Sequence, residues 1–206
     1  MWQFVKRLFT RCDDDIVEQS LEVKRETSVE SEEEVKKFYS AKERELVACH
    51  EAGHAIVCRI SAKNYVVQQI TIKPTKDYKG IVMARNVNGF FTKSDCLAEL
   101  QWKFGGMVAE QLMYGEHTTG AEKDIKDIKE YLFYMLEAVG MGTKFVYPSD
   151  MEISIEAENI LQNAKKECEN ILTENMQVLK NLQQELLKRE TIEEYELEIF
   201  FQMNGI

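Results

Sequence analysis

Basic residues are outnumbered by acidic ones in this sequence, and long apolar runs are absent. Its 206 residues contain 26 Lys and Arg against 36 Asp and Glu, which gives a formal net charge of -10. Because an acidic chain repels phosphate backbones, we expect no nucleic-acid partner. No run of about 18 apolar residues occurs, so we expect no segment that spans a bilayer.

A secretory signal and paired cysteines are also missing. The apolar stretch within residues 1–12 is short and is interrupted by Lys6, Arg7 and Arg11, unlike a signal peptide. The five cysteines form no Cys-x-x-Cys pair and are scattered through apolar stretches, as buried reduced thiols are. Such thiols suit a reducing compartment. We therefore expect a cytoplasmic protein.

A change in composition near Phe38 predicts two parts. Residues 1–39 form an N-terminal tail, in which a short basic amphipathic segment, residues 1–12, precedes an acidic linker. Trp2, Val5, Leu8 and Phe9 share one face of that segment, so we expect weak peripheral contact with a membrane. Residues 40–206 contain enough apolar residues for one domain with its own core.

Periodicity predicts that this domain is mainly α-helical with a small β-sheet, an α+β fold. Two strands are expected over residues 66–73 and 80–87, joined by a turn at residues 74–77. Helices are expected over residues 40–62, 92–113 and 119–140, the last two opened by the capping boxes Thr92/Asp95 and Thr119/Glu122. Residues 152–189 are expected to form a helical hairpin that breaks near Asn175, and Thr191 and Glu194 to cap a last short helix.

Two of the three histidines lie four residues apart, in the sequence His50-Glu51-Ala52-Gly53-His54. Four residues make about one helical turn, so both imidazoles lie on one face and can bind one Zn²⁺. Glu51 lies beside them, where its carboxylate can act as a general base on a metal-activated water. The flanking residues are apolar, and two buried histidines need partners, which favours a metal site over a solvated helix surface.

A catalytic zinc site needs a third protein ligand. The extension HExxHxxGxxH is absent, because Val57 and Ile60 occupy the positions that it requires. Spacing leaves several downstream candidates open: Asp95, Glu110, His117, Glu122, Asp124 and Asp127.

Several motifs occur in an order that is familiar: LVACHEAGHAIV, ITIKP, FGGMVAEQLMYG, TTGAEKDI, VGMG and ELLKRETI. Over residues 40–203 the chain resembles the peptidase domain of the FtsH family of ATP-dependent zinc proteases. The resemblance implies an FtsH-peptidase-like zincin helix bundle over residues 40–206. It also implies zinc bound by His50, His54 and the aspartate of TTGAxxD, here Asp124. Glu110 becomes a candidate for supporting the ligands from behind, and His117 becomes a loop residue.

The sequence departs from that family in three ways. It contains no GxxxxGK[ST] loop of the family's ATPase, it has no transmembrane span, and Met107 stands where the family usually has Arg. None of these departures removes a ligand or the base. We therefore expect a zinc-dependent endopeptidase that hydrolyses peptide bonds in unfolded or small proteins, without its own ATPase.

One alternative belongs to another class of function. The chain could be a non-catalytic or regulatory module that binds FtsH-type proteases or a membrane partner. The complete set His50, Glu51, His54 and Asp124 favours the enzyme, because a binding module does not need it. The resemblance implies a polypeptide substrate. Members of the family form six-fold rings, but much of that assembly involves the ATPase, so a homo-oligomer and a separate unfoldase both stay open as partners.

Overall fold

Ser40 caps the first helix of the described structure. The Ser40 hydroxyl accepts a hydrogen bond from the Glu43 amide at 3.2 Å, and the Glu43 carboxylate accepts one from the Ser40 amide at 2.8 Å. This reciprocal capping satisfies two amides that a helix start otherwise leaves without partners. Helix α4 then runs over Ala41–Ser61, in agreement with the prediction for residues 40–62.

The computed structural model describes residues 40–147 and 149–206. The predicted tail, residues 1–39, lies outside the described residues, so its boundary with the domain and its membrane contact stay predictions. Among the described residues, no helix combines the length and the apolar character that crossing a membrane requires.

Three antiparallel strands form a small sheet in the order β2-β1-β3. The first two, β1 (Tyr65–Thr71) and β2 (Ile81–Asn86), lie where the sequence predicts them. The third, β3, is the short segment Thr191–Glu193, which pairs with the end of β1. The prediction that Thr191 caps the last helix is therefore wrong, because Thr191 lies in a strand. Glu193 caps that helix, α10, which spans Glu194–Met203.

The other helical segments follow in chain order: α5 Lys93–Lys103, α6 Gly105–Tyr114, the 3₁₀ turn η2 Thr119–Ala121, α7 Glu122–Phe133, the π-helical turn η3 Tyr134–Ala138, α8 Asp150–Glu174 and α9 Met176–Arg189. The predicted helix over residues 92–113 is thus interrupted at Phe104. Its start is as predicted, since Thr92 and Asp95 form a capping box. The restart lays Gly105 against α4, where a Cβ would lie 2.7 Å from the Cα of His54.

The predicted capping box of Thr119 and Glu122 does not form. The Thr118 hydroxyl instead accepts a hydrogen bond from the Gly120 amide at 3.2 Å, and η2 leads into α7 without a side-chain cap. The segment ends close to the predicted residue, because Gly140 has a φ of 63°, a left-handed conformation that favours glycine.

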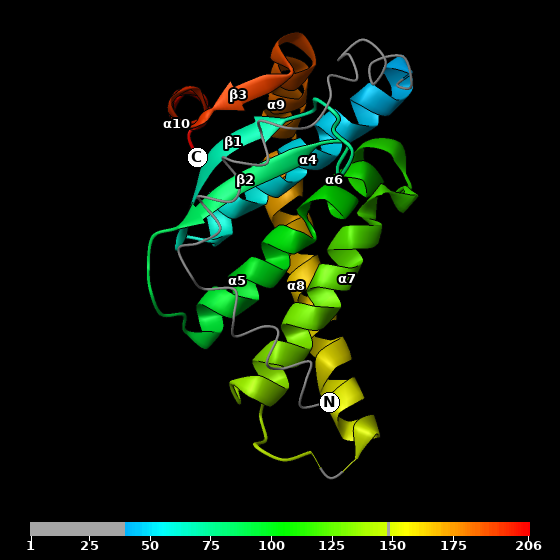
Figure 1. Ribbon diagram of the computed structural model, residues 1–206, viewed down its shortest axis with the longest axis vertical. Coiled ribbons are helices and arrows are strands. Elements are labelled where there is room, and N and C mark those ends of the chain that lie inside the picture. The colour runs from blue at the N-terminus through cyan, green and yellow to red at the C-terminus, as the bar shows by residue number, and fades with distance from the viewer. Residues whose placement is uncertain (1–39, 148) are drawn as a thin grey trace, which may run out of the picture. The chain divides into compact units, whose positions relative to one another are not determined.

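The predicted break near Asn175 occurs, but the predicted hairpin is wrong. The Asn175 amide still bonds to the carbonyl of Ile171, and the Leu179 amide bonds to the carbonyl of Asn175. With the helical hydrogen-bond pattern maintained on both sides, the break is a local bend. α9 therefore continues beyond the end of α8 without folding back along it, and it packs against α4 (Figure 1).

Helix α4 is the centre of the core. It packs against α5, α6, α9 and β1, and the sheet lies across it (Figure 1). Each residue from Ala48 to Cys58 is buried, including the two histidines of the sequence motif. Met107, at the position where arginine was expected from the family resemblance, is buried in the same core. The prediction of a mainly helical α+β domain is confirmed.

Candidate metal centre

His50 and His54 lie one turn apart on the buried stretch of α4. Only 8% of His50 and 7% of His54 is exposed. Their ring centroids are 4.7 Å apart, and the two Nε2 atoms face each other at 3.0 Å. The four-residue spacing therefore brings both imidazoles to one point.

A second hydrogen bond orients each imidazole. His54 Nδ1 donates to the backbone carbonyl of Trp102, 2.9 Å away. A carbonyl only accepts, so a neutral His54 carries its hydrogen on Nδ1 and its lone pair on Nε2. His50 Nδ1 faces the carboxylate of Glu110, with Oε1 at 2.7 Å. Both side chains thus present Nε2 as the atom that can bind a metal.

Asp124 joins the two histidines from the first turn of α7. Its Oδ2 lies 2.9 Å from His50 Nε2 and 3.4 Å from His54 Nε2. Burial raises the pKa of Asp124, but hydrogen bonds to His50 and His54 outweigh burial and hold the pKa well below its usual range. The N-terminus of α7 also favours the ionised form. Asp124 therefore contributes a negative charge at neutral pH.

The three donor atoms suit a bound cation. With hydrogen on both Nδ1 atoms, two lone pairs and one carboxylate oxygen meet, which is unfavourable unless a positive charge lies between them. Without a metal, His50 supplies that charge as a proton: burial lowers the pKa of His50, but hydrogen bonds to Asp124 and Glu110 raise it to about 10. The observed separations are close to the edge of about 3.3 Å that a tetrahedron with zinc–ligand distances of about 2.0–2.1 Å has.

This donor set indicates which kind of metal centre it could form. Two imidazoles and one carboxylate, with a fourth position open, are typical of catalytic zinc. Among residues 40–147 and 149–206, His50, His54 and Asp124 are the one group of three such side chains close enough to share an ion.

Glu51 lies beside this group and lines the same cleft. It is 7% exposed. Burial raises the pKa of Glu51, and the opposing charges of His54 and His50 do not cancel that rise. A carboxylate with a raised pKa accepts a proton more readily than an exposed one, which suits a general base.

The remaining candidate ligands lie outside the group. Asp95 accepts a hydrogen bond from the Thr92 amide at the start of α5, and His117 is exposed in the loop before η2. Glu122 and Asp127 line the cleft but are not among the clustered ligands. Glu110 is 2% exposed and faces the other side of the His50 ring.

Glu110 joins two parts of the site. While Oε1 bonds to His50, Oε2 accepts a hydrogen bond from the Thr118 amide at 2.6 Å. Hydrogen bonds to His50 and Thr118 outweigh the effect of burial, so the pKa of Glu110 is lowered. The carboxylate therefore orients His50 and also anchors the segment that leads to Asp124.

Two further groups shape the site without contributing a side chain. The search of the sequence for functional side chains therefore missed them. One is the Trp102 carbonyl, which fixes His54. Another is Gly106, where a Cβ would lie 2.3 Å from Nε2 of His50. The signal in the sequence is the Gly105-Gly106 pair, since adjacent glycines in a buried helix indicate that another backbone or ring lies very close.

A cleft of about 1020 Å³ opens onto the cluster. Its lining comes from α4, from residues 75–82 and from side chains between Thr118 and Asp127. Ile81 and Val82, at the start of β2, are part of this lining. The cleft thus brings the edge of the sheet next to His50, Glu51 and His54.

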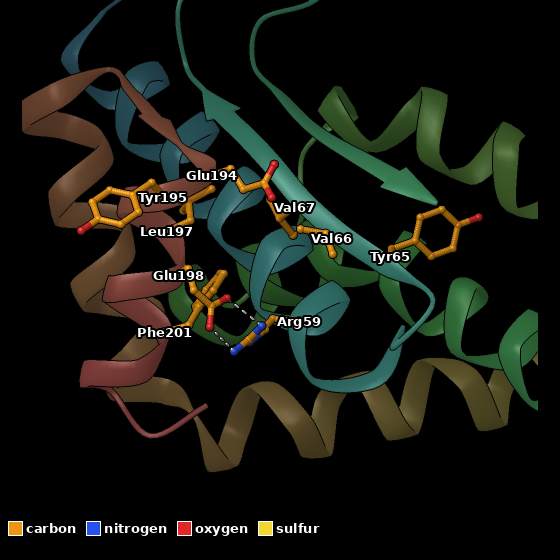
Figure 2. Close-up of a pocket in the computed structure, with 9 residues that line it drawn as sticks. All are labelled: Arg59, Tyr65, Val66, Val67, Glu194, Tyr195, Leu197, Glu198 and Phe201. Atoms are coloured by element: carbon orange, nitrogen blue, oxygen red, sulfur yellow. Dashed lines mark hydrogen bonds and ion pairs between the residues drawn. The ribbon is translucent and has the colours of Figure 1, made fainter. Parts of the chain in front are cut away.

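A smaller pocket, of about 360 Å³, lies between β1 and α10 (Figure 2). Arg59 of α4 forms two contacts of 2.9 and 3.0 Å with the Glu198 carboxylate across it. The same guanidinium lies 5.5 Å from the centre of the Phe201 ring. These contacts fasten α10 to α4, so the charges of this pocket have a structural role.

Comparison with known proteins gives a consistent result. Residues 37–149 match the sequence profile of peptidase family M41. An ATP-dependent zinc metalloprotease FtsH of Aster yellows witches'-broom phytoplasma is 29% identical over 177 residues, which is 79% of this chain and 26% of the relative.

Two further relatives come from other organisms. The ATP-dependent zinc metalloprotease FtsH of Ureaplasma parvum is 32% identical over 179 residues, which is 76% of this chain and 25% of the relative. FTSH 11, chloroplastic/mitochondrial, of Arabidopsis thaliana is 32% identical over 187 residues, which is 84% of this chain and 23% of the relative. The chain spans about a quarter of the length of these relatives.

Proposed function

The chain belongs to peptidase family M41, and from this membership we propose that it is a zinc-dependent endopeptidase that cleaves unfolded or small proteins. The observation that carries the proposal is the meeting of His50, His54 and Asp124 beside Glu51 in an open cleft. A group that only preserved the fold would not need three ligands, a base and access for a substrate together.

In this proposal the residues have separate roles. His50, His54 and Asp124 hold the metal, and the partners of their outer atoms keep the imidazoles in place. When bound, a zinc ion makes a coordinated water more acidic and polarises the carbonyl of the scissile peptide bond. Glu51 takes the proton from the attacking water and later delivers it to the leaving amine.

The sheet supports an extended polypeptide as the substrate. β2 pairs with β1 along one side, and within the described residues its other side has no strand partner. Because Ile81 and Val82 of β2 line the cleft, an extended chain could pair with this edge while it crosses the site. A folded protein cannot present such a segment, which is why we propose unfolded or small proteins.

In this proposal the 206 residues hydrolyse peptide bonds without binding ATP. The sequence contains no GxxxxGK[ST] loop that would hold a nucleotide's phosphates. Peptide hydrolysis itself releases free energy and needs no nucleotide. A separate unfoldase would be required only to open folded substrates.

The decisive experiment replaces Glu51. Glu51→Gln keeps the size of the side chain but removes the base, so cleavage of unfolded casein should fall by about 10²–10⁴-fold while bound zinc is unchanged. The assay uses the zinc-loaded chain without nucleotide, and Glu116→Gln, an exposed glutamate outside the cleft, is the control. A wild-type chain that binds zinc but cleaves nothing would support the regulatory module, and an active Glu51→Gln variant would exclude Glu51 as the base.

A further inference from the structure

We propose that Gly80 is a positioning residue for Glu51: the loop between β1 and β2 meets the base at a residue without a side chain, and this contact fixes the carboxylate in the cleft. The inference rests on the proposed function, because it concerns the base of that reaction. It adds a residue far from the HExxH sequence to the set that determines the rate.

The contact is close on the side of Glu51 that carries the chemistry. A Cβ built on Gly80 would lie 2.7 Å from Oε1 of Glu51 and 2.8 Å from its Cγ. The third near atom is Cγ1 of Val47, at 2.6 Å. Distances this short cannot exist in a relaxed structure, so any side chain at position 80 would displace a neighbour.

Space, and not backbone conformation, is what requires glycine here. The glycines with a positive φ among the described residues are Gly115, Gly140 and Gly205, and Gly80 is not one of them. An alanine at position 80 would therefore not have to adopt the left-handed backbone conformation that strains other residues. Its whole effect would come from the atoms that it touches.

Packing helps to hold the Glu51 carboxylate, beside the charges of His54 and His50 that act on it. No hydrogen bond or ion pair joins it to any residue in the described part of the chain. This distinguishes Glu51 from His50 and His54, which each have an orienting partner at the outer ring nitrogen. A side chain without such a partner takes its position from the surfaces around it, and Gly80 provides one of them.

The loop that carries Gly80 is itself well fixed. The Thr75 hydroxyl accepts hydrogen bonds from the amides of Asp77 and Tyr78, and the Thr75 amide donates to the carbonyl of Tyr78. Directly after Gly80, Ile81 pairs with Thr71 of β1.

The other neighbour is also stiff. Val47 is β-branched and lies within a helix, where its χ1 angle is restricted. The group that can move most easily is therefore the Glu51 side chain.

The test compares two glycine substitutions in the zinc-loaded chain. Gly80→Ala should lower kcat for unfolded casein by about 100-fold, the effect of misplacing a catalytic group by about 1 Å, with KM and zinc content unchanged. Gly89→Ala is the matched control, because no atom lies within 4 Å of a Cβ at that position. If Gly80→Ala is as active as the wild type, the proposal is wrong.

A second pair of variants separates positioning from a displaced loop. Binding of casein to Gly80→Ala/Glu51→Gln should equal binding to Glu51→Gln, because the cleft is intact and only the base has moved. Weaker binding would show that the loop has moved and would overturn the proposal. Should Gly80→Ala fold poorly, Val47→Ala/Gly80→Ala removes the other close contact and should fold normally, yet stay as slow.

A crystal structure of zinc-loaded Gly80→Ala gives an answer that does not depend on activity. The Glu51 carboxylate should be turned away while residues 72–80 keep their place. Displaced residues 72–80 around an unmoved Glu51 would refute the positioning role even if the wild type proves inactive. Inactivity of the wild type with a displaced Glu51 would contradict only the proposed function.

Discussion

The two halves of the candidate metal centre are built differently. On α4, His50 and His54 have side chains that are 11% and 9% exposed, and each is held by a second partner, Glu110 or the Trp102 carbonyl. On α7, the Asp124 side chain is 23% exposed. Within the described residues, its carboxylate bonds to the two histidines and to no other group.

This difference indicates which ligand side chains are already oriented in the metal-free chain. The imidazoles are oriented by the fold, because α4 is buried and their Nδ1 atoms are bonded. Asp124 depends on the charges at the centre, as its lowered pKa reflects. We therefore expect the α4 half to determine whether metal binds, and the α7 half to close the site around it.

Removing a ligand from each half should give the largest effects. His54→Ala should lower zinc affinity by more than about 100-fold, the upper end of what losing an orienting partner costs. Asp124→Ala should also weaken binding, but less, because both oriented imidazoles remain. Competition with a chromogenic chelator measures the zinc affinities of the wild type, His54→Ala and Asp124→Ala. His117→Ala, in an exposed loop, is the control and should bind zinc like the wild type. A larger loss for Asp124→Ala would reverse the comparison.

Removing the partner behind His50 should have an intermediate effect. Glu110→Gln keeps the shape, but an amide has one acceptor oxygen where the carboxylate uses two, for His50 and for Thr118. Zinc affinity should fall by about 10–100-fold. The same chelator competition, with Glu116→Gln as the control, checks this. Unaltered affinity would mean that burial alone orients His50.

Counted per unit of pH, the pH dependence should be the smallest effect. The pKa of His50 is raised to about 10 in the metal-free chain, so its proton is present at neutral pH and is lost only as the pH rises toward that value. Zinc must displace this proton, and affinity should rise by about tenfold per pH unit between pH 6 and 8.

Calorimetry in buffers of different ionisation enthalpy checks this, since it should show about one proton released per zinc. In contrast, Asp124 should release none, because its pKa is lowered and it is already ionised. Release of no proton would show that His50 is neutral before binding.

The same division explains what the sequence could predict. The α4 half follows from helix periodicity within five residues, so His50, Glu51 and His54 could be placed together from local sequence. Asp124 lies 74 positions beyond His50. Six candidates were open on spacing alone, and only the resemblance to a family singled out Asp124, because a contact at that separation depends on the whole fold.

The errors in the predicted fold have similar causes. β3 has three residues, too few to show a two-residue alternation, and it exists because β1 offers an edge. At Asn175 the sequence signals a break, but whether a helix bends or reverses depends on what it packs against, here α4. Gly80 matters because it has no side chain, and Trp102 matters through its backbone carbonyl. A pattern of residue types in the sequence reveals neither effect.

The pairing of β3 with β1 also bears on how this chain comes to be made. Thr71 and Thr191 join strands that are 120 positions apart, and α9 covers α4 from a similar distance along the chain. A ribosome adds about 5–20 residues per second, so α9 and β3 are synthesised on the order of ten seconds after α4. Until then the nascent protein carries α4 covered by α5, α6 and β1 but not by α9, and the apolar face left exposed is a target for chaperones.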